Sequence, residues 1–224
     1  MVKLKEDLYK SLIYQDRYEY ILEGIKNTVI MALFATIIGI ILGILIAVIQ
    51  DAHEKNKNLP VLNFLSKTYV SIIRGTPVLL QLMIIYYVIF KSVEVNGVLV
   101  GIIAFGLNSA AYVSEIIKSG INSINKGQME ASRSLGFSYK ESMFYVIMPQ
   151  AIKNILPALG NEFITLLKET SVAGYIGIMD LTKAADIIAS RTYDYLFPLI
   201  LIAIIYLIMT LGLSKLVKLM ERKL

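Results

Sequence analysis

Long apolar runs separated by short charged stretches dominate the chain. The clearest run, residues 27–50, contains no charged side chain, and about 20 apolar residues are enough to cross the roughly 30 Å hydrocarbon core of a bilayer. The pattern predicts an all-α integral membrane protein with about five transmembrane helices. The predicted spans are residues 27–50, 69–90, 97–117, 151–167 and 195–214.

Small residues and proline mark two features within these spans. Gly39 and Gly43 form a GxxxG pair, which permits close approach of another helix, although scattered small residues in a long apolar helix are an equal alternative. Pro77 disfavours helical geometry at the preceding residue, so a kink is expected at Arg74, Gly75 and Pro77. Residues 170–190 are too polar for a span and predict a short helix packed beneath the external surface.

The first 26 residues mix cations and anions without the short apolar core or small-residue cleavage site of a signal peptide. They predict an interfacial N-terminal segment, followed by one membrane domain over residues 27–224. The longest later polar stretch belongs to a loop at about residues 118–149.

The amino-acid composition is typical of a membrane protein and makes disulfide bonds and a histidine-based metal site unexpected. Apolar residues make up 56% of the 224 residues, whereas soluble domains have about 45–50%. The chain has no cysteine and a single histidine, His53, so neither a disulfide framework nor a histidine-based metal site is expected. The net charge of +5 reflects basic loops rather than a nucleic-acid partner.

Basic residues predict the orientation, because short cytoplasmic loops are enriched in Lys and Arg. With the C-terminus inside, twelve cations lie at the cytoplasmic side and four (Lys91, Lys168, Lys183 and Arg191) lie at or near the outer side. The N-terminus is then outside. The twelve are Lys55, Lys57, Lys67, Lys118, Lys126, Arg133, Lys140, Lys153, Lys215, Lys218, Arg222 and Lys223.

The polar loop contains the sequence GQMEASRSLGFSYKESMFYVIMP at residues 127–149. Its first half predicts a short helix that ends where the chain turns at Gly136. Such a helix, projecting between two spans, is suited to a groove in a second protein. The residues assigned to this contact are Gln128, Glu130, Ala131, Ser132, Arg133, Leu135 and Gly136.

This loop resembles the EAA loop (EAAxxxG, nine residues, IxLP) of permease subunits in ATP-binding-cassette (ABC) importers, with Glu130, Ala131, Gly136 and Pro149 in matching positions. Ser132, Val146 and Met148 replace the second alanine, the isoleucine and the leucine. The segments around residues 74–81, 107–112 and 157–162 also resemble the polar amino acid branch of that family, so the likeness covers most of residues 27–222.

The resemblance implies a bacterial plasma-membrane permease subunit of the type I fold that pairs with a second permease subunit. A separate ATP-binding subunit would hold ATP and Mg²⁺, and an extracellular solute-binding protein would deliver the substrate. The chain has no GxxxxGK[ST] phosphate loop. We therefore expect a transport subunit with no cofactor and no ATPase site of its own.

Polar residues inside the spans indicate a pathway, because a central charge in hydrocarbon costs roughly 2.5–3.5 kcal/mol. One face of the third span and one of the fourth carry such groups. A buried carboxylate such as Glu162 would pair with a substrate α-ammonium group, and Asn108, Asn161 or a helix end with the α-carboxylate. Pairing among these groups themselves is the alternative. The candidates are Asn108, Tyr112, Glu115, Asn161, Glu162 and Thr165.

An ion- or proton-coupled secondary carrier, with Glu115 and Glu162 as coupling carboxylates, is the main alternative function. Five spans do not divide into the two equal inverted halves that many carriers have. An intramembrane enzyme has little support, since no nucleophile–base set can be assembled. The exact substrate and the choice between homodimer and heterodimer stay open.

Overall fold

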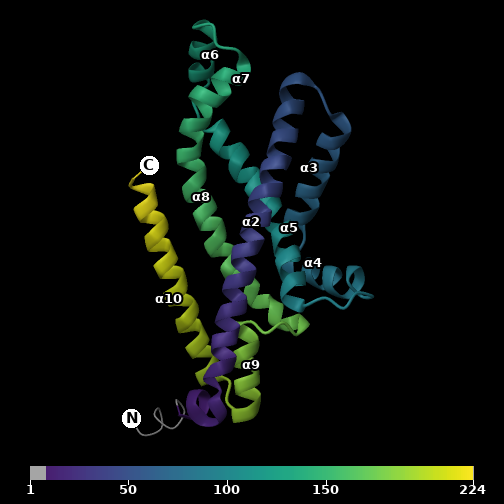
Figure 1. The fold of residues 1–224 in the computed structure, drawn as a ribbon, viewed down its shortest axis with the longest axis vertical. Helices are drawn as coiled ribbons and strands as arrows, with labels where there is room; N and C mark the ends of the chain where they lie inside the picture. Colours follow the sequence, from purple (N-terminus) through teal and green to yellow (C-terminus); the bar gives the residue numbers. More distant parts are fainter. Residues whose placement is uncertain (1–8, 224) are drawn as a thin grey trace.

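A single long helix, α2 (Tyr18–Asn56), runs the length of the molecule (Figure 1). The computed structural model describes residues 9–223, in which the short helices η1 (Tyr9–Ile13) and η2 (Tyr14–Asp16) precede α2. The predicted N-terminal segment, residues 1–26, lies partly outside the described residues. Residues 18–26 are the first turns of α2 rather than a separate interfacial helix, because no proline interrupts the chain between Tyr18 and Asn56.

The second predicted span is not one helix. It consists of α3 (Pro60–Gly75), α4 (Val78–Ile84) and η3 (Ile85–Ile89), with a bend of 111° between α3 and the α4–η3 segment. The predicted kink is therefore confirmed in position, and residues 69–90 lie in a broken span or a re-entrant segment rather than in a straight helix. Thr76 is extended (φ −125°, ψ 149°) because the proline ring at Pro77 excludes the helical conformation.

After η3 the chain forms three further long helices, α5, α8 and α10, which are joined by shorter ones. Within residues 9–223, three helices, α2, α5 and α10, are long and apolar enough to cross a membrane, and the bent pair would make a fourth. The fourth predicted span corresponds to the more polar α8. The elements are α5 (Gly97–Asn122), α6 (Lys126–Ser134), α7 (Tyr139–Glu141), η4 (Ser142–Ile147), α8 (Met148–Glu169), η5 (Thr170–Ile176), α9 (Leu181–Thr192) and α10 (Leu196–Glu221).

Figure 1 shows how the chain runs between the two ends of the molecule. As the chain proceeds, α2, α5 and α10 run in one direction, whereas α3 and α8 run in the other. The short helices α6 and α7 project at the end where α2 and α5 finish, and α9 lies at the opposite end beside the start of α2. The short helix expected within residues 170–190 is thus present, as η5 and α9.

Glycine allows α2 and α5 to pack closely. A Cβ atom on Gly39 would lie 2.7 Å from Ser109 Oγ, and one on Gly43 would lie 2.6 Å from Val113 Cγ1. Gly106 of α5 is equally close to Ile38 of α2. The GxxxG prediction is confirmed, because a larger side chain at either position of α2 would separate the two helices.

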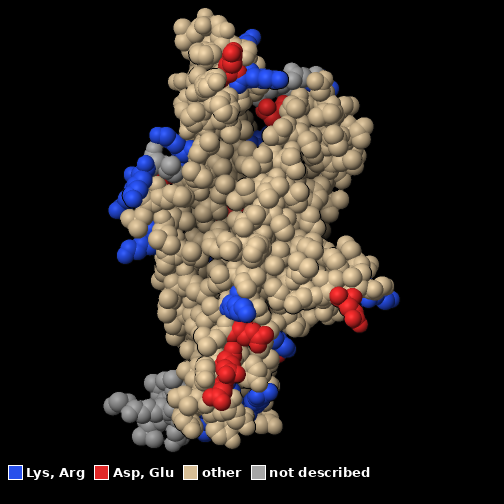
Figure 2. Space-filling model, in the orientation of Figure 1, with Lys and Arg blue, Asp and Glu red and all other residues tan. Residues whose placement is uncertain are grey.

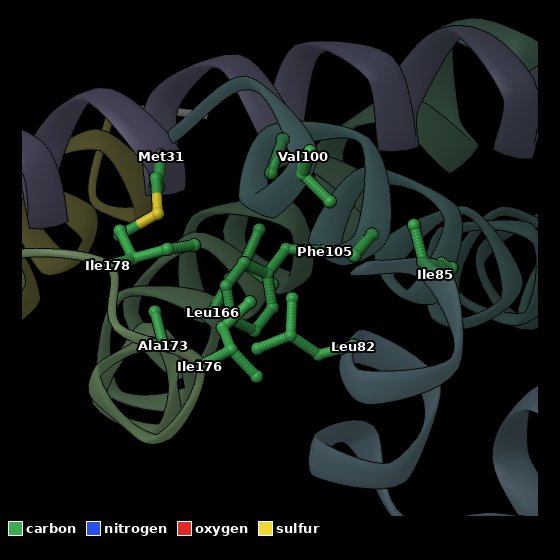
Figure 3. Packing of buried hydrophobic residues seen from close by; sticks show 11 residues of the cluster. Met31, Leu82, Ile85, Val100, Phe105, Leu166, Ala173, Ile176 and Ile178 are labelled. Carbon is green, nitrogen blue, oxygen red and sulfur yellow. The ribbon is translucent and has the colours of Figure 1, made fainter. Parts of the chain in front are cut away.

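The main apolar core lies between α2, α4, α5, α8 and η5 (Figure 3). Phe105 of α5 is fully buried at its centre, next to Leu82 of the bent segment and Leu166 of α8. Ile176 and Ile178, from η5 and the turn after it, close the cluster. This core fixes the start of α5 against the bent pair and the end of α8.

Candidate functional site

A hollow of about 490 Å³ opens between α3, α5 and α8. Three of the predicted pathway residues line it together, namely Tyr112, Glu115 and Glu162, and Arg74 joins them from the last turn of α3. A guanidinium and two carboxylates thus share one cavity. Groups of opposite charge in such a space fit a zwitterionic ligand, which carries both charges.

Glu162 is half-buried on α8, and its Oε1 accepts a hydrogen bond of 3.0 Å from Ser109 Oγ of α5. Ser109 is itself fully buried against Gly39, so the contact aligns Glu162 with the α2–α5 pair. Asn161 and Thr165 are exposed and are not among the residues that line the hollow. These two residues therefore do not share this hollow with Glu162, and their role in the pathway stays a prediction.

Arg74 bridges α3 and α5. Its Nη1 lies 3.2 Å from Glu115 Oε2, and its guanidinium lies 5.7 Å from the centre of the Tyr112 ring. Both charged side chains are close to half exposed, and an ion pair of this kind contributes only about 0–1 kcal/mol. Arg74 thus pairs with a carboxylate, and the weak pair can exchange partners at low cost.

Gln81 provides hydrogen bonds to the backbone at the bend. Its Nε2 donates to the carbonyl oxygens of Ile73 (2.8 Å) and Thr76 (3.1 Å), and to Thr76 Oγ1 (2.8 Å). These carbonyls lack helical partners because the proline interrupts α3. The sequence gives no periodic signal for this role, since a lone glutamine in an apolar run has no visible partner.

Asn108 completes the same junction. It is 2% exposed, and its Nδ2 donates to Gln81 Oε1 at 2.9 Å. The side chain therefore ties α5 to the bent pair instead of lining the hollow, which corrects the prediction that Asn108, Tyr112 and Glu115 share one open face. Gly75 has no close neighbour for a Cβ atom and an ordinary φ, so the bend depends on Pro77 and Gln81 rather than on this glycine.

The predicted short helix is present as α6, with Asn125 as its N-cap. Asn125 Oδ1 accepts a hydrogen bond of 2.8 Å from the Gly127 N–H. The helix ends at Ser134, and the chain turns at Gly136, whose φ of +91° is a conformation that favours glycine. The Phe137 N–H donates to the Ser132 carbonyl at 3.3 Å across this turn, the closure typical of helix C-termini.

The surface of this arm is largely free. We define the arm as residues 125–141, which project beyond the ends of α5 and α8 (Figure 1). Leu135 is 80% exposed at its tip, and six of the seven predicted contact residues are exposed. The exception is Ser132, which is 4% exposed and donates to the Met129 carbonyl. Ser132 therefore packs inside the arm rather than on its surface.

The far side of the arm is stabilised by a capping box at the start of α7. The Glu141 N–H donates to Ser138 Oγ (3.3 Å), and the Ser138 N–H donates to Glu141 Oε2 (2.7 Å). Hydrogen bonds from the Ser138 side chain and backbone hold the pKa of Glu141 below its usual value. Glu141 therefore stays ionised at neutral pH, and the turn between α6 and α7 keeps its shape.

The fold and these two features describe a helical membrane protein with a protruding arm. The sequence matches the family described as the binding-protein-dependent transport system inner membrane component over residues 39–224. Because this match covers most of the chain, the protein belongs to that family. It is a permease subunit of an ABC importer, and nothing in the comparisons supports the secondary-carrier alternative.

Relatives of known name and solved structures agree with this family assignment. A permease protein of Rickettsia typhi named for a glutamine transport system is 42% identical over 206 residues (91% of this chain and 92% of the relative). The arginine transport system permease protein of Bacillus subtilis is 41% identical and is aligned over 92% of both chains.

The crystal structure of an amino acid ABC transporter with histidines is 43% identical, with a TM-score of 0.86 over 92% of this chain and 95% of that chain. The methionine ABC transporter MetNI in an inward-facing form shares the fold at 18% identity, with a TM-score of 0.72 over 93% of this chain and 96% of that one.

We predict that Gln81→Leu destabilises the protein by about 1–3 kcal/mol, because it leaves the buried Asn108 amide and the bend carbonyls without partners. Thermal unfolding of the purified protein in detergent measures the change. The double variant Gln81→Leu/Asn108→Leu should recover the part due to Asn108 but not the part due to the carbonyls. Wild-type stability in the single variant would show that Gln81 does not hold the bend.

Proposed function

We propose that this chain forms the translocation pathway for a polar amino acid and is driven by a separate ATP-binding subunit through the arm. In this proposal the partner subunit holds ATP and Mg²⁺ and performs hydrolysis. A second permease subunit, identical or related, completes the pathway, and an extracellular solute-binding protein delivers substrate. The complex lies in a bacterial plasma membrane, with the arm and C-terminus in the cytoplasm and the N-terminus outside.

The geometry of the arm carries the proposal. Gln128, Glu130, Ala131, Arg133 and Leu135 are exposed on a capped, rigid unit. An exposed leucine at the tip of a polar helix is suited to a pocket in another protein, where burial of apolar area provides affinity. The arm is continuous with α5 on one side and with η4 and α8 on the other. Movement of the arm would therefore reach both walls of the hollow.

The hollow supplies charges for the substrate. Glu162 would take the α-ammonium group, and the Arg74 guanidinium is placed to take the α-carboxylate in exchange for Glu115, since all three line the same space. Glu115 then becomes available to a second cationic group. The proposal of an amino acid substrate is supported by relatives named for glutamine and arginine transport and by a solved structure with histidines.

We predict that Gly136→Val uncouples transport. Valine disfavours a φ of +91°, so the turn after α6 would change and the tip would leave its partner's pocket. ATP-driven uptake into vesicles containing the complete transporter should fall by more than about tenfold. Gly75→Ala is the matched control, because this exposed glycine has no close neighbour. Normal uptake with Gly136→Val would contradict the coupling role of the arm.

We predict that Glu162→Gln reduces uptake of labelled arginine, histidine or glutamine by more than about tenfold, since it removes the charge that pairs with the ammonium group. Glutamine keeps an oxygen that can accept from Ser109 Oγ, so the fold should be retained. Glu94→Gln, in an exposed turn, is the control. Unchanged uptake and unchanged substrate-stimulated ATPase activity in Glu162→Gln would exclude this residue from the substrate site.

A further inference from the structure

The last helix carries an exposed stripe that changes from apolar to cationic along its length. Residues separated alternately by four and three positions lie on one face of a helix. Five such positions in α10, together with its C-cap residue, begin with three apolar residues and end with three basic ones. They are Ile204, Ile208, Leu211, Lys215, Lys218 and Arg222.

All six side chains are exposed on the surface of the protein. Ile204 is 48% exposed, Ile208 66% and Leu211 60%, and the three cations are exposed as well. Within residues 9–223, none of the three cations is paired with a carboxylate. Figure 2 shows blue side chains gathered where α10 ends, on the left of the view.

The length of α10 places these cations at a membrane boundary. Its 26 residues extend about 39 Å at 1.5 Å per residue, whereas the hydrocarbon core is about 30 Å thick. The last two turns therefore leave the hydrocarbon region at the end of the molecule that also bears the arm. Lys223 adds a fourth cation there, against one acidic neighbour, Glu221.

We propose that this stripe binds anionic phospholipids of the cytoplasmic leaflet, with the phosphate head group on Lys215, Lys218 and Arg222 and an acyl chain along Ile204, Ile208 and Leu211. The apolar and the basic residues follow one another on one face of the helix, as the acyl chain and the head group do in a phospholipid. A free phosphate would use only the cations, and an acidic protein would leave the apolar half in contact with hydrocarbon. Clusters of Lys and Arg directly after a membrane helix attract anionic lipids.

The bound lipid would also hold α10 against α8. Gly160 of α8 packs against Val217 of α10, where a Cβ atom on the glycine would be 2.7 Å from Val217 Cγ2. This contact is two residues along α8 from Glu162. A lipid that holds α10 at one depth in the membrane would therefore also hold α8, which forms one wall of the hollow. This lipid site rests on the proposed orientation, with the C-terminus in the cytoplasm, and not on the amino acid specificity or the coupling role.

The test is native mass spectrometry of the complete transporter, released from nanodiscs of phosphatidylcholine with equal parts of phosphatidylglycerol. Wild type should retain phosphatidylglycerol in preference to phosphatidylcholine by on the order of tenfold. Lys215→Gln/Lys218→Gln/Arg222→Gln should lose the preference, and Lys215→Arg/Lys218→Arg should keep it. The triple variant Lys10→Gln/Lys26→Gln/Lys91→Gln removes three exposed cations elsewhere and should behave as wild type.

The apolar half has its own test. Ile208→Ser/Leu211→Ser should reduce retention of both lipids, because it removes the surface for the acyl chain. Persistence of the preference in the triple glutamine variant, or its equal loss in the control triple variant, would overturn the proposal. Displacement of phosphatidylglycerol by inorganic phosphate at equal concentration would show that the cations bind phosphate alone. Absence of lipid from this face in the assembled transporter would show that a second subunit covers it.

Discussion

The close contact between α2 and α5 is the interaction on which the other features depend. Gly39 leaves room for Ser109, and Ser109 Oγ in turn donates to Glu162 on α8. The absence of a side chain at Gly39 on α2 therefore affects the position of Glu162 on α8, through Ser109 on α5. Because α5 also carries Asn108, Tyr112 and Glu115 and leads into the arm, a shift of α5 against α2 would alter the hollow, the bend and the arm together.

The second constraint is that backbone groups in a membrane need internal partners. Pro77 breaks the helix between α3 and α4, and Gln81 supplies the donors that the freed carbonyls require. Asn108 joins this junction to α5. The structure thus contains a strong buried network next to a weak, solvent-accessible pair between Arg74 and Glu115. The difference fits a division into a buried scaffold and a charge pair that can change partners.

Sequence patterns predicted the features that depend on local chemistry. The apolar runs located the long helices, Pro77 located the bend, and the spacing of Glu130 and Gly136 located α6 and its end. Patterns did not predict the 111° angle, because the angle depends on packing of Leu82 and Ile85 into the shared core. Helical periodicity placed Asn108 with Tyr112 and Glu115, but a partner 27 residues away turned it inward. Asn161 and Thr165 are exposed outside the hollow, because side-chain spacing does not say which neighbour a helix face meets, and their place in the pathway stays a prediction.

The source of energy for uptake tests the central claim most directly. Vesicles that contain the complete transporter, with binding protein and labelled arginine outside, can be given internal ATP with the proton gradient collapsed, or a proton gradient without ATP. An importer subunit coupled through the arm predicts uptake only in the first condition, and loss of that uptake when Leu135 at the tip is changed to Asp. Uptake that requires the gradient and proceeds without ATP would contradict the account.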